Sequence, residues 1–402
     1  QNGVFNDYST GSWGKKLTSA DQIYNNIKDF FQTGTVVDNS LSVSGGNKNG
    51  TFYLSASRFD QKGIVPTTGY DKTTVRFNGD QKYGKFSIGA NVSYSIANTD
   101  KTLTSGGLYG SGGTGAMNSV YRWARTEDMT KYLNADGTKY RMFEGKQVLA
   151  DDVENPYWIL NKNVLNDKTN RFTGAVNASY KLADWFNIDY RIGYDNYSTN
   201  NYTFIAPGGA VKETFQNGKL SDSDYMYEYL SSNLMLNFHK TIADFDLNLL
   251  IGQSIEDTKT RTERRNGYNF ATEGFYSYEN IAAGDKFFQS LASSRRLMGV
   301  YGELRAAYKN IAYLTVTSRN DWTSTLPVAN RSYFYPSVSG SFVFTELMPK
   351  SDILSFGKVR ASWARVGKDT DPYATATTLW SPREFLAGVG TALGALGWLA
   401  QT

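Results

Sequence analysis

The sequence predicts an all-β protein, an antiparallel up-and-down transmembrane β-barrel of which about twelve strands are present. Three observations favour this fold class. Apolar and polar residues alternate with period two along much of the chain, aromatic residues make up 15% of it, and short and long links alternate between the segments. Tyr and Phe at this density favour strands and membrane-interface girdles over a helical core.

The composition excludes several other classes. The 402 residues contain no Cys and a single His, which rules out a disulfide scaffold, a zinc finger and a multi-His metal site. A net charge of +4 argues against a strongly basic nucleic-acid-binding surface. No run of about 18 apolar residues exists, so an α-helical membrane protein is excluded. We therefore expect no cofactor and no metal, and we expect His239 to be structural.

The clearest alternation runs from Phe86 to Ile96, where every even position is apolar and the odd positions are Ser, Gly or Asn. From Phe186 to Asp195 one face is apolar, while the other carries Asp189 and Arg191. Segments of this kind approach the length of a membrane-spanning strand. Further strands are predicted around 36–45, 51–61, 70–80, 170–182, 224–239, 245–251, 298–305, 312–320, 334–344 and 354–366.

The links indicate where the strands turn. Short turns are predicted at 46–50, 81–85, 182–184, 240–244, 309–311 and 346–353. Long links are predicted at 98–168, 197–223 and 258–289, with a longer link around Pro66 and an intermediate one at 321–332. An outer-membrane barrel has tight periplasmic turns and long extracellular loops, whereas a soluble sandwich has no reason to keep its long loops at one end. One helix is predicted, from Thr18 to Phe31, on the extracellular side.

Two patterns invite a catalytic or nucleotide-binding interpretation. Gly110 to Gly115 matches G-x-G-x-x-G, but a dinucleotide site needs that string between a strand and a helix, and a flexible loop is the better interpretation. Asp189 and Arg191 could be cast as part of a catalytic cluster, but on an alternating strand they are predicted to face the lumen. With no nucleophile–base pair and no metal cluster, the sequence predicts that the protein is not an enzyme.

Aromatic residues in the long links are candidate contacts for a solute or for a lid. Flat aromatic faces stack on sugar rings and apolar peptide surfaces, and Tyr adds a polar tip. The alternatives are packing within the loops and an interfacial girdle. Lys and Arg do not cluster around these rings, which disfavours nucleic acid. The candidates are Tyr121, Trp123, Tyr157, Trp158 and Trp322.

Several segments together resemble a known family. The segments are NSLSVSGG at 39–46, YLSAS at 53–57, GIVP at 63–66, NPY at 155–157, LTVTSRN at 314–320, YPSVS at 335–339 and VRASWARVG at 359–367. Their order and spacing over residues 1–385 resemble the SusC/RagA-type TonB-linked outer-membrane transporters of Bacteroidetes.

The resemblance implies a barrel of about 22 strands that holds an N-terminal plug. It also implies a SusD-like surface lipoprotein over the mouth, TonB as the energy source, and uptake of oligosaccharides or peptides across the outer membrane of a Gram-negative cell. We expect residues 1–385 to form a partial barrel domain without the plug. Residues 386–402 are expected to form an atypical tail, because they show neither strand alternation nor family character.

The leading hypothesis is therefore a nutrient-uptake component of the outer membrane that performs no bond chemistry. Two alternatives remain. The first is a TonB-dependent receptor for siderophores or cobalamin. The second is a secreted β-rich adhesin or carbohydrate-binding module, which would stay soluble without detergent and would pack two sheets around a dry interior.

Overall fold

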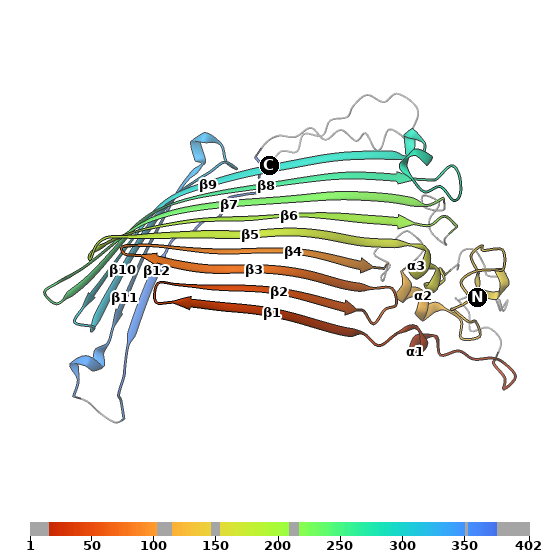
Figure 1. Cartoon of the computed structure of the whole chain (residues 1–402), viewed down its shortest axis with the longest axis horizontal. Coiled ribbons are helices and arrows are strands. Elements are labelled where there is room, and N and C mark those ends of the chain that lie inside the picture. The colour runs from red at the N-terminus through yellow and green to blue at the C-terminus, as the bar shows by residue number, and fades with distance from the viewer. Residues whose placement is uncertain (1–15, 103–114, 146–152, 209–216, 350–352, 376–402) are drawn as a thin grey trace, which may run out of the picture.

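The computed structural model describes residues 16–102, 115–145, 153–208, 217–349 and 353–375. Twelve strands form one sheet in which each strand pairs antiparallel with its neighbours in sequence (Figure 1). The strands are β1 (Thr35–Asn47), β2 (Gly50–Lys62), β3 (Gly69–Tyr83), β4 (Phe86–Lys101), β5 (Val164–Ala183), β6 (Phe186–Ile205), β7 (Lys219–Ile242), β8 (Phe245–Tyr268), β9 (Lys286–Tyr308), β10 (Ala312–Thr323), β11 (Ser332–Phe342) and β12 (Val359–Ala364). The predicted up-and-down barrel fold is confirmed, including the strand number.

Helices are few and short. They are α1 (Asn26–Phe30), α2 (Ala116–Arg122) and α3 (Pro156–Lys162), with 3-10 turns η1 (Met142–Gly145), η4 (Tyr278–Asn280), η5 (Ala283–Asp285), η6 (Val328–Asn330) and η7 (Phe344–Leu347). The helix predicted from Thr18 to Phe31 was too long, since only its last turn is helical. Among the described helices, none is long and apolar enough to span a membrane.

The register sorts the side chains onto two faces of the sheet, because successive residues of a strand point to opposite sides. One row of paired residues is apolar, and the adjacent row is polar. The apolar row contains Val43, Leu54, Phe77 and Val92, and the polar row contains Ser42, Ser55, Arg76, Ser93 and Thr173. We call the two sides of the sheet the apolar face and the polar face.

The apolar face is exposed, which a soluble protein avoids over so large an area. Leu41 is 79% exposed, and Leu54 and Phe77 are 44% and 42% exposed. The period-two alternation that predicted the strands therefore separates two surfaces of one sheet. Within the described ranges there is no second sheet to cover the apolar side, which contradicts the sandwich alternative.

The apolar surface is a band with two different borders. At the short-turn end, the rings of Trp185 and Phe186 stack at 5.8 Å and those of Phe186 and Phe238 at 4.6 Å, as in the aromatic girdle of a membrane barrel. At the other end the same face carries ion pairs, such as Arg296 with Asp257 at 2.6 Å. The band between these borders corresponds to about ten residues per strand, the length that crosses a bilayer when tilted.

Several strands extend beyond the lengths that the sequence predicted. β7 and β8 each contain 24 residues and pair without interruption. Their outer halves carry charged pairs on the apolar side in place of apolar residues, such as Lys259 with Glu228 at 3.4 Å. Alternation in hydropathy disappears there although the strand continues, so the predicted links at 197–223 and 258–289 were too long.

The predicted alternation of links is confirmed for most of the sheet. β3 and β4 meet in a two-residue turn, where Gly84 adopts a left-handed backbone with φ +56°. One link departs from the pattern, because residues 343–358 form a longer connection at the short-turn end. There the backbone N–H of Gly357 donates to Thr345 Oγ1 at 3.0 Å instead of to a neighbouring strand. The last strand is accordingly shorter than the predicted 354–366.

A charged substitution distinguishes the two faces at one level of the wall. We expect Val92→Arg, on the apolar face, to lower the free energy of unfolding by about 2–4 kcal/mol, because arginine there meets hydrocarbon. The matched control is Asn91→Arg, one residue away on the polar face, which should change stability by less than about 1 kcal/mol. Denaturant titration of each variant refolded into lipid bilayers measures both values. Equal losses would contradict the assignment of the faces.

Candidate solute-contacting surfaces

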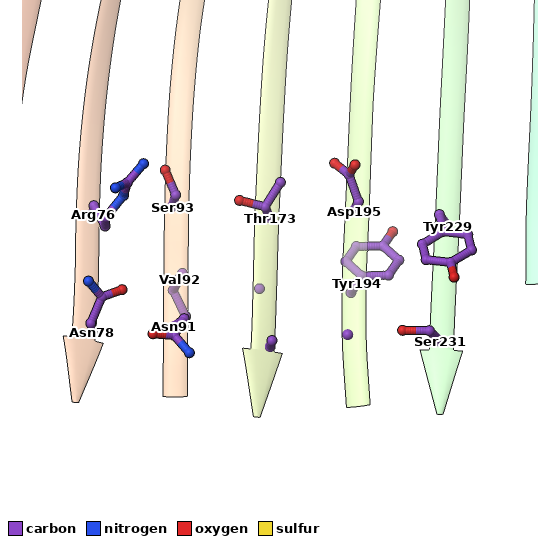
Figure 2. A pocket seen from close by; sticks show the side chains of 13 residues that line it. Arg76, Asn78, Asn91, Val92, Ser93, Thr173, Tyr194, Asp195, Tyr229 and Ser231 are labelled. Carbon is purple, nitrogen blue, oxygen red and sulfur yellow. The ribbon is translucent and has the colours of Figure 1, made fainter. Parts of the chain in front are cut away.

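The polar face is hollowed over the middle strands of the sheet. A hollow of about 470 Å³ lies over β3 to β7 (Figure 2). Arg76, Asn78 and Asn91 contribute amide and guanidinium groups, and Asp195 and Tyr229 contribute a carboxylate and a phenol. We call it the central hollow. Its lining can donate and accept hydrogen bonds but holds no arrangement that suggests bond chemistry.

Beside the central hollow, an ion pair joins β5 to β6. Arg171 donates to both carboxylate oxygens of Asp195, from Nε at 2.9 Å and from an Nη at 2.6 Å. The same guanidinium lies 5.5 Å from the ring centroid of Tyr197, and that ring stacks on Tyr227 at 4.9 Å. Bidentate pairing and ring stacking hold these long side chains in one geometry. These contacts form a continuous aromatic and charged surface across β5, β6 and β7.

Asp189 and Arg191 both lie on the polar face, as the alternation predicted, but they do not bond to each other. The amides of Asn187 and Asn237 donate to Asp189 at 2.7 Å each. Arg191 donates from Nε to Asn177 Oδ1 at 2.7 Å. Each group is thus satisfied by a neutral amide, which suits a wetted wall. The assignment of both residues to a lumen stays a prediction.

The long link between β4 and β5 contains a folded unit. Helices α2 and α3 pack with α1 around buried side chains, among them Phe30, Val120, Met142 and Ile159. Asn155 begins α3, because its side chain accepts from the backbone N–H groups of Tyr157 and Trp158 at 2.8 and 3.2 Å. We call α1, residues 115–145 and residues 153–163 the loop unit. Its compactness was not predicted from the sequence.

Burial corrects two of the aromatic candidates. Trp123 is 4% exposed and Trp158 is 6% exposed, whereas a residue that contacts a solute or a lid has to be accessible. They pack inside the loop unit, which is the alternative that the sequence left open. Neither indole N–H has a hydrogen-bond partner among the described residues. These two rings contribute to the core of the loop and are not available to stack on a solute.

The other three aromatic candidates lie at different depths. Tyr121 is 63% exposed on α2 and is free to contact a partner. Tyr157 is half-buried, with its ring edge-on to Phe30 at 6.0 Å. Trp322 lies on β10 rather than in a link, is 39% exposed, and points to the apolar side between Met298 and Ser332. The role of these residues as solute or lid contacts stays a prediction.

Buried charges and hydrogen bonds lock the loop unit together. Lys139 and Glu154 form an ion pair at 3.0 Å, with side chains 7% and 3% exposed. Tyr140 donates to Glu127 Oε2 at 2.7 Å. Burial and the neighbouring Glu127 carboxylate both raise the pKa of Tyr140, so its phenol keeps its proton and remains a donor.

The loop unit also holds the segment that leads into β1. Asn26 on α1 donates to the backbone oxygens of Ala124 and Glu127 at 3.1 and 3.3 Å. These contacts join residues about a hundred positions apart in the sequence, so no local pattern could have revealed them. Asn155-Pro156 is the one sequence signal of this unit, since Asn at an N-cap followed by Pro is typical of a helix start.

Groups for catalysis or metal binding are not gathered in the described ranges. No set of three or more His, Asp or Glu side chains there could hold a metal ion. His239 lies at the end of β7, with Nδ1 2.9 Å from Asn248 Oδ1. Most of the Gly110 to Gly115 string falls outside the described residues, as does the segment 386–402.

The chain is similar in sequence to known TonB-dependent receptors. The chain is 27% identical over 359 residues to the TonB-dependent receptor P3 of Formosa agariphila, covering 86% of this chain and 34% of that receptor. It is 23% identical over 384 residues to the TonB-dependent receptor SusC of Bacteroides thetaiotaomicron, covering 90% of this chain and 37% of SusC. No protein-family model matches the sequence.

Among solved structures, the RagAB peptide transporter superposes with a TM-score of 0.76 at 17% identity, covering 97% of this chain and 43% of that one. Its open-open state gives a TM-score of 0.75. At this level of identity the superposition shows a shared fold. The chain spans about a third of the length of the curated relatives that it matches.

The fold is that of the wall of an outer-membrane-type β-barrel, which has an apolar face and a polar face. The predicted resemblance to SusC/RagA-type TonB-dependent receptors is confirmed, and the chain corresponds to part of their barrel. The relatives named above are receptors or transporters by name.

A substitution in α1 tests the loop unit. Phe30 is 1% exposed, so we expect Phe30→Ala to destabilise this unit locally by about 3–5 kcal/mol through loss of burial and creation of a cavity. Ile27 is 47% exposed on the same helix, and Ile27→Ala is the matched control. Limited proteolysis of the protein in intact outer membranes should cut 115–163 faster only in Phe30→Ala. Unchanged cleavage of that variant would show that α1 does not support the loop.

Proposed function

We propose that this chain is the barrel portion of a SusC-like TonB-dependent transporter that imports oligosaccharides or peptides across the outer membrane of a Gram-negative cell. The polar face lines the transport path, and the apolar face contacts lipid. Import consists of binding and gating, without making or breaking a bond in the solute.

The observation that carries this proposal is the single sheet with chemically opposite faces. A banded, exposed apolar side requires lipid, because so much apolar area would aggregate in water. A continuous polar side with hollows requires water or solute. Of the protein classes considered above, a transport barrel uses both surfaces at once.

The proposed partners follow from the resemblance. A SusD-like lipoprotein would cover the rim that carries the loop unit, where Tyr121 stands exposed. TonB would act through a plug, which is a region separate from the described wall. In this proposal residues 1–385 are the partial barrel domain, and 386–402 are a tail apart from it.

Two measurements in the bacterium that carries the gene test the proposal. Fractionation should recover the protein with the outer membrane, and extraction should require detergent. Deletion of the gene should abolish uptake of at least one fluorescently labelled oligosaccharide or peptide, and the complete gene should restore it. A protein that stays soluble without detergent, or a deletion strain that takes up every solute normally, would refute the proposal.

A further inference from the structure

A second hollow lies on the polar face, beside the central one and over β1 to β5. Its volume is about 710 Å³. Ser and Thr hydroxyls dominate its lining, with Ser42, Ser55 and Ser93 among them, and Tyr53 and Tyr70 add phenols. We call it the hydroxyl-lined hollow. Such a surface offers many small donors and acceptors and little aliphatic area.

The lining of this hollow carries more cationic than anionic side chains. Its lining contains three cationic side chains, Lys72, Arg76 and Arg171, and one carboxylate, that of Asp38. Arg171 is neutralised by the bidentate pair with Asp195. Within the described ranges, Lys72 and Arg76 form no ion pair.

The cations on the other face behave differently. There, Arg58, Lys259 and Arg296 are each paired with a carboxylate. Lys72 and Arg76 form no such pair with the one carboxylate of their hollow, and both line that hollow from the same strand.

The register places these charges around one spot. Thr74 lies between Lys72 and Arg76 on the same face of β3, and its paired row continues through Ser95 on β4 to Arg171 on β5. The Cα atoms of Lys72 and Arg76 are separated by roughly 13 Å, and Arg171 is two strands away, roughly 10 Å. Side chains of this length can converge on a group the size of a carboxylate or sulfate.

Figure 2 shows the lower edge of this arrangement. Arg76, Ser93, Thr173 and Asp195 lie in one row across β3, β4, β5 and β6. On the opposite side of β3, Val75 and Phe77 still belong to the apolar band, whereas Asp71 belongs to the charged outer zone. The hollow therefore lies at the outer edge of the lipid-facing band, where a solute that enters from outside arrives early.

We infer that the hydroxyl-lined hollow is a binding subsite for a carboxylate or sulfate group of an anionic solute. Lys72 and Arg76 supply the opposing charge, and the Ser and Thr hydroxyls bind the polar groups around it. This inference rests on the proposed transport function and deepens it, since it names the chemical class of solute. The hydroxyl lining and the scarcity of aliphatic side chains favour an acidic oligosaccharide as the carrier of the anion.

The experiment compares two variants of the complete protein, purified in detergent. Lys72→Gln/Arg76→Gln removes both cations of the hollow. Lys82→Gln is the matched control, because Lys82 lies on the same strand and the same polar face but lines a different hollow. Calorimetry is performed with an oligogalacturonate, a neutral malto-oligosaccharide of equal length and a Glu-rich peptide.

We expect the unaltered protein to prefer the oligogalacturonate to the neutral sugar, and the double variant to lose about tenfold or more in affinity for it. Affinity for the neutral sugar, and the behaviour of Lys82→Gln with every probe, should stay within about twofold. Added salt should weaken binding of the acidic probe alone, since exposed charges are screened. Binding of the Glu-rich peptide in place of the oligogalacturonate, with the same dependence on Lys72 and Arg76, would support the anion subsite and identify a peptide as its carrier.

Two results would overturn the inference. One is a double variant that binds both acidic probes as tightly as the unaltered protein, and the other is an unaltered protein without preference for acidic probes. Failure of the transport function itself has a different signature, because deletion of the gene would then leave uptake of every solute intact. Heat-modifiable mobility on gels confirms that both variants are folded before they are compared.

Discussion

The structure depends on the need to pair every backbone N–H and C=O group in an environment without water. In hydrocarbon an unpaired group costs several kcal/mol, so strands are tolerated only when each is bonded to its neighbours. Twelve strands paired in chain order meet this need for the ten inner strands with the simplest connectivity available, while among the described residues β1 and β12 are each paired along one edge. Once the pairing is fixed, the alternation of side chains decides which residues lie on the apolar face and which lie on the polar face.

The two faces solve their polar requirements in different ways. On the polar side, amides as well as opposite charges satisfy charged groups, as Asn187 and Asn237 do for Asp189 and Arg171 does for Asp195. On the apolar side, ion pairs such as that of Arg296 with Asp257 lie beyond the lipid band. The separation of apolar and polar side chains onto two faces explains why a chain with a mean hydropathy of -0.46 can still present a large apolar surface.

The sequence allowed the sheet to be predicted in detail, because period two is a local signal that survives from Phe86 to Ile96 and from Phe186 to Asp195. The polar orientation of Asp189 and Arg191 followed from the same signal. The outer halves of β7 and β8 were not predicted, because ion pairs there replace the alternation of apolar and polar residues. The burial of Trp123 and Trp158 was not predicted for another reason. It depends on contacts such as those of Asn26 with Ala124, which link distant parts of the chain.

The extension of β7 and β8 past the lipid band changes the mechanics of the mouth. A hairpin whose strands stay hydrogen-bonded to each other loses little conformational entropy when a ligand binds to it. A flexible loop of equal length would have to be ordered first, at an entropic cost. The outer halves of β7 and β8 are thus a preorganised, hydrogen-bonded rim. Contacts made on this rim can be selective at small entropic cost.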